Sequence, residues 1–429
     1  MRRTTIAVLV VIGLLTVGAC GNSENEGSGN ADEAGGGTPG VSEDTIRVGG
    51  VGSVTNPIGV KAGSAFEGAK AYLDRINEEG GVDGREIELV AEEDDNALAS
   101  RNASLVRSLV QQEDVFAVLP VATLAFSGAR FLADEGIPTF GWNINTEWEG
   151  PENLFGEKGS YLCFDCGSPF LPFLARQAGA SKSGIIAYTA AQSAACASGQ
   201  RKSYERFGQQ AGVELVFEDT SLGFGFTPGT LDGDIQAMRD RGVQFLGTCI
   251  DGAGSGRLGE AIDRADLDII QYLPNGYDQD IVEQFGGVLE GSYVNSFAFP
   301  FEAEDPPEGM QQYKQAMEDT GTEVNELSLA GWISADLFVT GLRAVADSGD
   351  DLTRQGLVDT INAMEDYDAG GILPGTDWTI AHDQLESEPC LAFLQIRDSE
   401  FTPVLGRPGE PFVCLNSEDP DFDAPIIRG

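Results

Sequence analysis

Hydrophobic and polar positions follow two periods along the chain, and residues 114–145 give the clearest example. An uninterrupted apolar run at 115–119 predicts a strand buried on both faces of a parallel sheet, and Pro120 ends it. Apolar residues then recur at helical spacing as far as Gly136, a suitable C-terminal cap. These positions are Leu124, Phe126, Ala129, Phe131 and Leu132. A second strand follows at 137–141, so the stretch predicts one strand–helix–strand unit.

The same theme recurs over most of the chain. Strands are predicted at 45–51, 86–92, 184–188, 213–217, 243–249 and 269–273. Helices are predicted at 62–77, 97–112, 169–178, 195–211, 230–241, 254–265, 307–318, 327–347 and 352–364, and a hairpin at 390–405. Strands that alternate with helices indicate parallel sheets with right-handed crossovers. Two runs of the theme predict an α/β fold of two lobes.

Short turns follow two neighbouring strands, at 121–123 and 142–145. The carboxyl ends of parallel strands lie at one edge of a sheet, and ligands of open α/β sheets bind at that edge. We therefore interpret these turns as half of a binding mouth.

The N-terminus has the features of an export signal. Arg2 and Arg3 precede an apolar stretch at 6–17, which is shorter than the about 20 residues of a spanning helix. Residues 15–20, Leu-Thr-Val-Gly-Ala-Cys, resemble a bacterial lipobox, which implies that 1–20 is a lipoprotein signal and that Cys20 is lipidated. Ordinary cleavage and a retained anchor are the alternatives. A Gly-, Ser- and acid-rich tract then predicts a flexible tether at 21–44.

Length and charge narrow the classes of function. The 429 residues suit two domains, and the formal net charge is −43, or −45 once Arg2 and Arg3 leave with the signal. This charge excludes a nucleic-acid partner and an anionic membrane surface as binding targets. We interpret it as a means of solubility outside the cell rather than as an acidic partner-binding surface.

Apart from Cys20 the chain has six cysteines, an even number that predicts disulfides in an exported protein. Our preferred set is Cys163–Cys166, Cys196–Cys249 and Cys390–Cys414. The Cys163-Phe-Asp-Cys166 motif also suits a redox dithiol. A zinc site lacks a second ligand pair, so we predict no metal and no cofactor.

Three landmarks resemble those of type I solute-binding proteins of the branched-chain amino acid and amide class. They are Gly-Gly-Val-Asp-Gly-Arg at 80–85, Glu-Asp-Asp at 93–95 and Ala-Asp-Glu-Gly-Ile-Pro at 133–138. The resemblance implies two Rossmann-like lobes joined by a three-strand hinge, with a small solute enclosed between them. It implies lobe 1 at 45–163 and 291–378, and lobe 2 at 167–288 and 381–429. The crossovers are expected near 162–170, 287–295 and 377–382.

The resemblance also implies binding residues in the first lobe, and here the sequence departs from the family. The family usually has a Ser and a Thr that grip a ligand carboxylate, where this chain has Ala122 and Thr123. The next turn offers Trp142, Asn143 and Asn145.

In the second lobe the acidic residue that meets a ligand ammonium aligns with Asn275, which cannot neutralise a cation. A zwitterionic aliphatic amino acid is therefore a less suitable ligand than for a typical relative.

Further second-lobe candidates are Tyr188, Gln192, Asp251 and Tyr277. Each has a structural alternative: the tyrosines can cap the core, Asp251 can cap the next helix and Gln192 can face solvent. We expect Cys196 and Cys249 to lie at strand ends, where a disulfide between them would join two mouth turns. Trp332 is a core residue unless the start of its helix reaches the mouth.

The resemblance implies a non-enzymatic, monomeric, extracytoplasmic receptor of an ABC importer that captures an amino acid-like solute or amide by hinge closure. A receptor of the same fold that reports to a sensor is the first alternative. An extracellular hydrolase is the second, but His382, the only histidine, has no Gly-X-Ser-X-Gly motif to accompany it. Residues 49–52 lack a complete nucleotide-binding fingerprint, and 93–95 lack EF-hand spacing.

Overall fold

We analysed a computed structural model, which describes residues 37–382 and 390–429. The predicted signal, Cys20 and the tether as far as residue 36 lie outside the described residues. The folded body begins earlier than the predicted boundary at residue 44. The Thr38 hydroxyl donates a hydrogen bond to the Leu352 carbonyl (2.7 Å), and the Gly40 carbonyl accepts one from the Arg47 amide (2.8 Å).

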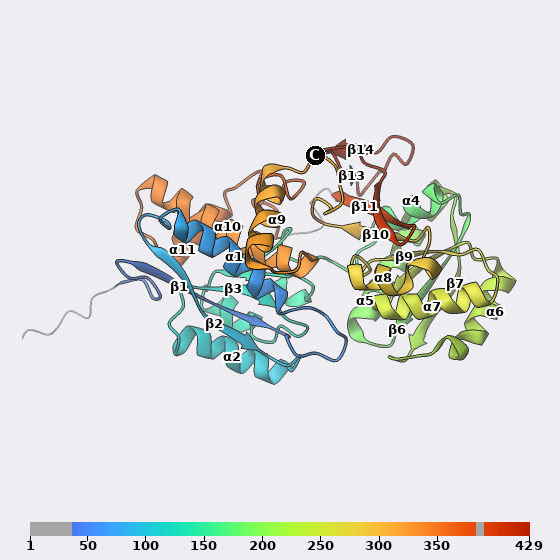
Figure 1. Ribbon diagram of the computed structural model, residues 1–429, viewed down its shortest axis with the longest axis horizontal. Coiled ribbons are helices and arrows are strands. Elements are labelled where there is room, and N and C mark those ends of the chain that lie inside the picture. The colour runs from blue at the N-terminus through green and yellow to red at the C-terminus, as the bar shows by residue number, and fades with distance from the viewer. Residues whose placement is uncertain (1–36, 383–389) are drawn as a thin grey trace, which may run out of the picture. The chain divides into compact units, whose positions relative to one another are not determined.

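The first sheet is fully parallel, with strand order β2-β1-β3-β4-β5. Its strands are β1 (Thr45–Gly52), β2 (Glu86–Asp94), β3 (Ala117–Ala122), β4 (Thr139–Gly141) and β5 (Leu154–Gly156). Its helices are α1 (Ser64–Glu78), α2 (Ala99–Gln111), α3 (Ala129–Asp134), α9 (Glu308–Thr320), α10 (Glu326–Ser348) and α11 (Arg354–Ile361). Figure 1 shows these elements gathered around the sheet.

Strand β3 is buried on both faces, as the apolar run predicts. Ala117 and Leu119 pack in one core with α1 and α10, whereas Val118 and Val121 pack in another with α2 and α3. The predicted end of the strand at Pro120 is wrong. The pairing of β3 with both neighbours shifts register at this point, and such an irregularity accommodates the missing proline N–H.

The following helix is also shorter than the apolar spacing predicts. It begins at Ala129, because the preceding residues form a turn in which the Thr123 hydroxyl accepts a hydrogen bond from the Ala125 amide (3.3 Å).

The second sheet has strand order β14-β13-β11-β10-β9-β8-β6-β7, with β12 paired to β11. Its strands are β6 (Lys182–Tyr188), β7 (Glu214–Leu222), β8 (Phe245–Cys249), β9 (Ile270–Leu273), β10 (Tyr293–Ser296), β11 (Cys390–Arg397), β12 (Glu400–Val404), β13 (Phe412–Cys414) and β14 (Ile426–Arg428). Its helices are α4 (Phe170–Gln177), α5 (Ala191–Ala211), α6 (Asp232–Arg241), α7 (Gly252–Arg264) and α8 (Gln279–Phe285). Strands β6 to β10 are parallel, whereas β11 to β14 pair antiparallel, so this sheet is mixed.

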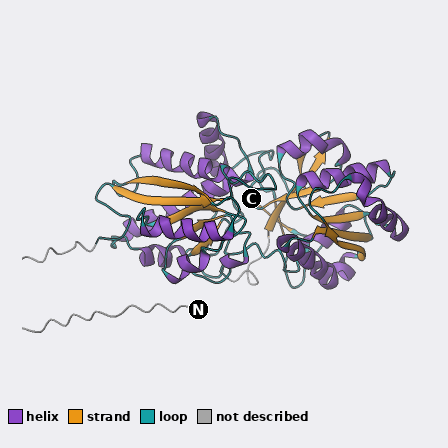
Figure 2. Cartoon of the chain, turned by 90° about the horizontal axis from the view of Figure 1, so that it is seen from below, coloured by secondary structure: helices purple, strands orange, loops and turns teal. Residues whose placement is uncertain are grey.

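The predicted two-lobed α/β fold is confirmed, and Figure 2 shows the two sheets in separate groups of helices and strands. The chain passes between the sheets at 157–169, at 297–307 and between α11 and β11. The second passage follows β10 and does not lie at 287–295 as predicted, because Tyr293 pairs with Tyr272 of β9 and with Gln395 of β11. The segment expected in lobe 1 from residue 291 thus starts with a strand of the second sheet.

Helix α10 is long and apolar enough to cross a membrane, but 72% of its most apolar window is buried inside the protein. Its Trp332 is 1% exposed and packs against Tyr72 of α1 and Tyr313 of α9. Helix α10 is therefore a core helix of the first lobe, and Trp332 is a core residue.

Candidate functional site

The candidate site consists of the turns that follow the parallel strands at the carboxyl edge of each sheet, which we call the mouth turns. In the first lobe they follow β1, β2, β3, β4 and β5, and in the second lobe β6, β7, β8 and β9. All ten candidate binding residues lie in these turns or at their borders. Most of them, however, are engaged by other protein groups.

Thr123 belongs to a buried polar network in the first lobe. Its hydroxyl donates a hydrogen bond to a carboxylate oxygen of Asp95, which also accepts from Ser53 Oγ (2.7 Å) and Asn102 Nδ2 (3.0 Å). All four side chains are fully buried. Ser53, Asp95 and Thr123 follow β1, β2 and β3, so the Asp95 carboxylate fixes three mouth turns together. The sequence shows only that Asp95 follows a strand, and no local pattern reveals this role.

The other first-lobe candidates are largely turned into the protein. Ala122 is buried at the end of β3, and its carbonyl accepts from the Ser53 amide (2.9 Å). Asn143 is fully buried and donates to the Gly159 carbonyl (3.2 Å), while Asn145 donates to the Thr123 carbonyl (2.9 Å). The Asn143 amide thus joins the turn after β4 to the turn after β5, and the Asn145 amide joins it to the turn after β3. Trp142 is half-buried in the same turn.

In the second lobe Tyr188 and Asp251 bind each other. The Tyr188 hydroxyl donates to Asp251 Oδ2 (2.5 Å), and the other oxygen of Asp251 accepts from the Gly254 amide (2.9 Å). Asp251 is thus the N-cap of α7, the structural alternative that the sequence offered. The outer face of the pair is covered by Phe224, whose ring centroid lies 4.4 Å from that of Tyr188.

Tyr277 is also a structural residue. Its hydroxyl donates to Glu302 Oε2 (2.6 Å) and accepts from the Phe301 amide (2.7 Å), and its ring packs against Phe301 and Phe401. Asn275, two residues earlier, is exposed.

Gln192, at the start of α5, is exposed, and its amide lies 3.4 Å from the Leu124 carbonyl. This contact joins a mouth turn of the second lobe to one of the first.

All three expected disulfides are present. Cys390–Cys414 joins paired positions of β11 and β13. Cys249 ends β8 as expected, but the expected position of Cys196 at a strand end is wrong, because it lies in α5. The bridge therefore fastens the start of α5 to the end of β8.

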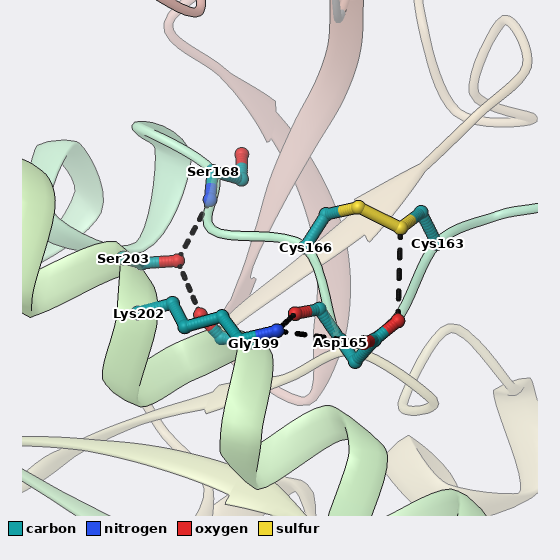
Figure 3. Close-up of a disulfide and its surroundings, with 7 residues drawn as sticks. All are labelled: Cys163, Asp165, Cys166, Ser168, Gly199, Lys202 and Ser203. Atoms are coloured by element: carbon teal, nitrogen blue, oxygen red, sulfur yellow. Dashed lines mark hydrogen bonds and ion pairs between the residues drawn. A yellow bond between two sulfur atoms is a disulfide. The ribbon is translucent and has the colours of Figure 1, made fainter. Parts of the chain in front are cut away.

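The Cys163–Cys166 bridge closes a turn in the first connecting segment, and Figure 3 shows this turn resting on α5. Lys202 Nζ donates to the Asp165 carbonyl (2.7 Å), and a Cβ on Gly199 would lie 2.1 Å from the Phe164 carbonyl oxygen. Cys163, Asp165 and Cys166 are the one group of three potential metal ligands in the described parts of the chain. Since the two sulfurs are bonded to each other, they cannot bind zinc as thiolates.

Two half-buried carboxylates lie in first-lobe segments at the mouth, and the sequence analysis did not name them. Burial raises the pKa of Glu157, just after β5, to about 8. Burial also raises the pKa of Glu326, the first residue of α10, and the nearby Glu157 and Asp278 raise it further. Both carboxylates therefore favour the protonated, hydrogen-bond-donating form.

His382 is half-buried and packs against core residues of the first lobe. Its Nε2 lies 2.9 Å from Asn362 Oδ1, and its ring contacts Phe155 and Trp378. Burial lowers the pKa of His382 to about 4, so the ring is neutral at physiological pH.

Two cavities of about 270 and 140 Å³ lie away from the mouth turns. The larger is bordered by Arg176 and Phe422, and the smaller by Arg85 and Leu342. Neither contains a candidate binding residue.

Two α/β lobes, three connecting segments and facing mouth turns define the class of two-lobed binding proteins. The chain belongs to the periplasmic binding protein family, whose model matches residues 45–400. Members of this family bind small solutes outside the cytoplasm.

Solved structures support the same fold. A branched-chain amino acid ABC transporter protein from Thermus thermophilus with bound valine has a TM-score of 0.70 and 16% identity, over 85% of this chain and 96% of that chain. LivJ from Streptococcus pneumoniae with isoleucine has a TM-score of 0.68 and 16% identity, over 83% and 98%. A solute-binding protein from R. palustris with benzoate has a TM-score of 0.64 and 16% identity, over 87% and 98%. Comparison with curated protein sequences gives no match.

Proposed function

We propose that the protein is the lipid-anchored, extracytoplasmic receptor of an ABC importer and captures a small polar solute, an amino acid derivative or amide, between its lobes. The observation that carries the proposal is the family match over both lobes, together with the contact between the mouth turns at Gln192 and Leu124. The solute that touches both lobes stabilises the closed form by its difference in affinity for the two forms.

The engaged side chains limit which solutes suit this mouth. A zwitterionic amino acid needs a fixed anion for its ammonium and free hydroxyls for its carboxylate. Here the Thr123 hydroxyl is already hydrogen-bonded to Asp95, and Asn275 stands where the family has an acidic residue. Neutral amides therefore fit better than valine or isoleucine, although the structural relatives named above were solved with valine, isoleucine and benzoate.

A thermal-shift screen of the purified protein tests the receptor role. The set should contain carboxamides, N-acyl amino acids, benzoate, valine and isoleucine, because binding to the folded state raises the melting temperature by mass action. We expect a neutral amide to give the largest rise, and a larger rise with valine or isoleucine would contradict the preference for a neutral solute. If none of these solutes raises the melting temperature, the proposed ligand class is contradicted.

Lipidation is tested separately. We expect incorporation of labelled fatty acid that Cys20→Ser abolishes, and retention of the label by the variant would contradict the anchor. The gene neighbourhood gives a further test, because an adjacent permease and ATPase support import, whereas an adjacent histidine kinase supports sensing.

A further inference from the structure

Lys61 connects the two lobes through an ion cluster at the mouth. It lies in the turn between β1 and α1 of the first lobe. Its Nζ lies 2.9 Å from Asp280 and 3.5 Å from Asp278, which begin α8 of the second lobe after β9. It also lies 2.7 Å from Glu323, which precedes α10 of the first lobe. One ammonium group thus holds carboxylates of both lobes.

The ammonium group of Lys61 is the one cation among three carboxylates in this cluster. Burial lowers the pKa of Lys61, but hydrogen bonds to Glu323 and Asp280 and the charge of Asp278 outweigh this effect, so the net shift is upward. Without the ammonium the cluster would bring like charges from the two lobes together, in a chain of net charge −43. Lys61 therefore converts a repulsive contact between the lobes into an attractive one.

One of the acidic partners, Asp278, is anchored by the start of its own helix. Asp278 is the N-cap of α8, and its Oδ1 accepts a hydrogen bond from the Asp280 amide (3.0 Å). Helix α8 follows the turn that contains Tyr277, which is itself fixed by Glu302 and Phe301. A charge that draws Lys61 toward α8 therefore draws the first lobe toward the second lobe as a whole.

The cluster remains accessible to solvent. The Lys61 side chain is 27% exposed, and those of Asp278, Glu323 and Asp280 are 38%, 54% and 68% exposed. The Debye length falls from about 10 Å at 0.1 M salt to about 3 Å at 1 M, so salt weakens such pairs.

We propose that Lys61 is an electrostatic latch that stabilises the closed form and so determines how firmly an enclosed solute is retained. The inference rests on the proposed receptor function and assigns a positioning role, since Lys61 acts through the second lobe. Closure then depends on ionic strength, and the affinity for solute depends on it too.

Small-angle X-ray scattering of the purified protein without solute tests the latch. We expect wild type to be more compact at 20 mM NaCl than at 1 M NaCl. At 20 mM NaCl Lys61→Ala should have a larger radius of gyration than wild type, because the carboxylates of the two lobes then repel each other, and at 1 M NaCl the two proteins should have equal radii. Lys61→Arg should behave as wild type at both salt concentrations. Lys70→Ala, which removes an exposed lysine from the neighbouring helix α1, is the matched control and should behave as wild type.

Charge reversal separates a latch from a general structural role. Lys61→Glu should open the lobes further, and adding Asp280→Lys should restore compactness at low salt. Equal radii of wild type and Lys61→Ala at 20 mM NaCl, or no restoration by the double variant, would overturn the proposal. Circular dichroism at the same salt concentrations checks that each variant is folded.

Solute binding then distinguishes this inference from the proposed function. For the solute with the largest thermal shift, we expect Lys61→Ala to weaken affinity roughly fivefold at low salt and hardly at all at 1 M NaCl. A protein that binds a solute equally well with and without Lys61 would refute the latch and leave the receptor role intact. A protein that closes through Lys61 but binds none of the tested solutes would support the latch and contradict the proposed receptor function.

Discussion

Replacement of Asp95 tests whether the polar residues of the first lobe serve the fold rather than the ligand. Its carboxylate is fully buried and accepts hydrogen bonds from Ser53, Asn102 and Thr123 and from the Ala97 amide (2.9 Å). Asp95→Ala removes the acceptor and leaves three polar side chains buried without their partner. The turns after β1, β2 and β3 then lose the hydrogen-bond acceptor that they share.

The magnitude follows from these contacts. A buried polar group left without a partner costs about 1–3 kcal/mol, so three such groups suggest a large loss. Removal of a buried charge returns part of this free energy, because its desolvation penalty disappears. We expect Asp95→Ala to lower the free energy of unfolding by about 3–5 kcal/mol, and Asp95→Asn, which keeps the shape and one acceptor, by roughly half of that.

Urea unfolding, followed by tryptophan fluorescence and circular dichroism, measures this loss. Trp148 is buried in the core beside these turns and reports on the first lobe. Glu92→Ala, an exposed acidic residue of the same strand, is the control and should change stability by less than about 0.5 kcal/mol. If Asp95→Ala is no less stable than Glu92→Ala, the network does not fix the turns and Thr123 becomes available as a ligand group again.

Three further outcomes are expected from the structure. Replacing Cys196 and Cys249 by serine opens a bridge with a sequence separation of 53 and should cost about 4 kcal/mol, measured as a lower urea midpoint; an unchanged midpoint would show that the bridge adds nothing. Burial raises the pKa of Glu157 to about 8, so its contribution to the free energy of unfolding is complete below pH 4.5 and is lost as pH rises through 8. The free energy of unfolding of Glu157→Gln should therefore rise by about 1–3 kcal/mol relative to that of wild type between pH 5 and 9. A difference between the two proteins that does not change with pH would contradict burial as the cause. Burial lowers the pKa of His382 to about 4, so its contribution to the free energy of unfolding is complete above pH 6.5 and is lost as pH falls through 4. His382→Gln, which can still donate to Asn362, should reduce this loss of stability at low pH by about 1–3 kcal/mol. Stability curves of the variant and wild type that run parallel from pH 7 to pH 4 would refute this role of His382.

The fold could be predicted because its evidence is local and repeated. Apolar runs such as 115–119 mark strands buried on both faces, and the even cysteine count limits the disulfides. The errors arose where a long-range partner decides the outcome. Strand β10 joins the second sheet because β9 and β11 flank it, and β11 lies about a hundred residues further along the chain. Pro120 remains in a strand because its neighbours shift register around it.

The binding residues were harder to predict, since a polar side chain after a strand can point either toward the ligand or into the protein. Thr123 is turned inward by Asp95 and Asn102, which no local pattern connects to it. The position of Lys61 has the same cause, because its partners lie more than two hundred residues away along the chain. The N-cap role of Asp251, by contrast, was available from the sequence, because an aspartate before a helix has a local partner.

The inward direction of these side chains bears on recognition. Thr123, Asn143, Asn145, Tyr188, Asp251 and Tyr277 already have protein partners, so a solute that replaced any of these contacts would leave a polar group to be satisfied again. Gln192 and Asn275 are exposed and neutral, Trp142 is half-buried, and Phe224 is 59% exposed. Outside the Lys61 cluster, amide groups and aromatic faces are thus the accessible side chains among these residues of the mouth. We therefore propose that the receptor gains affinity by packing against a neutral solute and by the closing of Lys61 on the second lobe, rather than by pairing with a charged ligand.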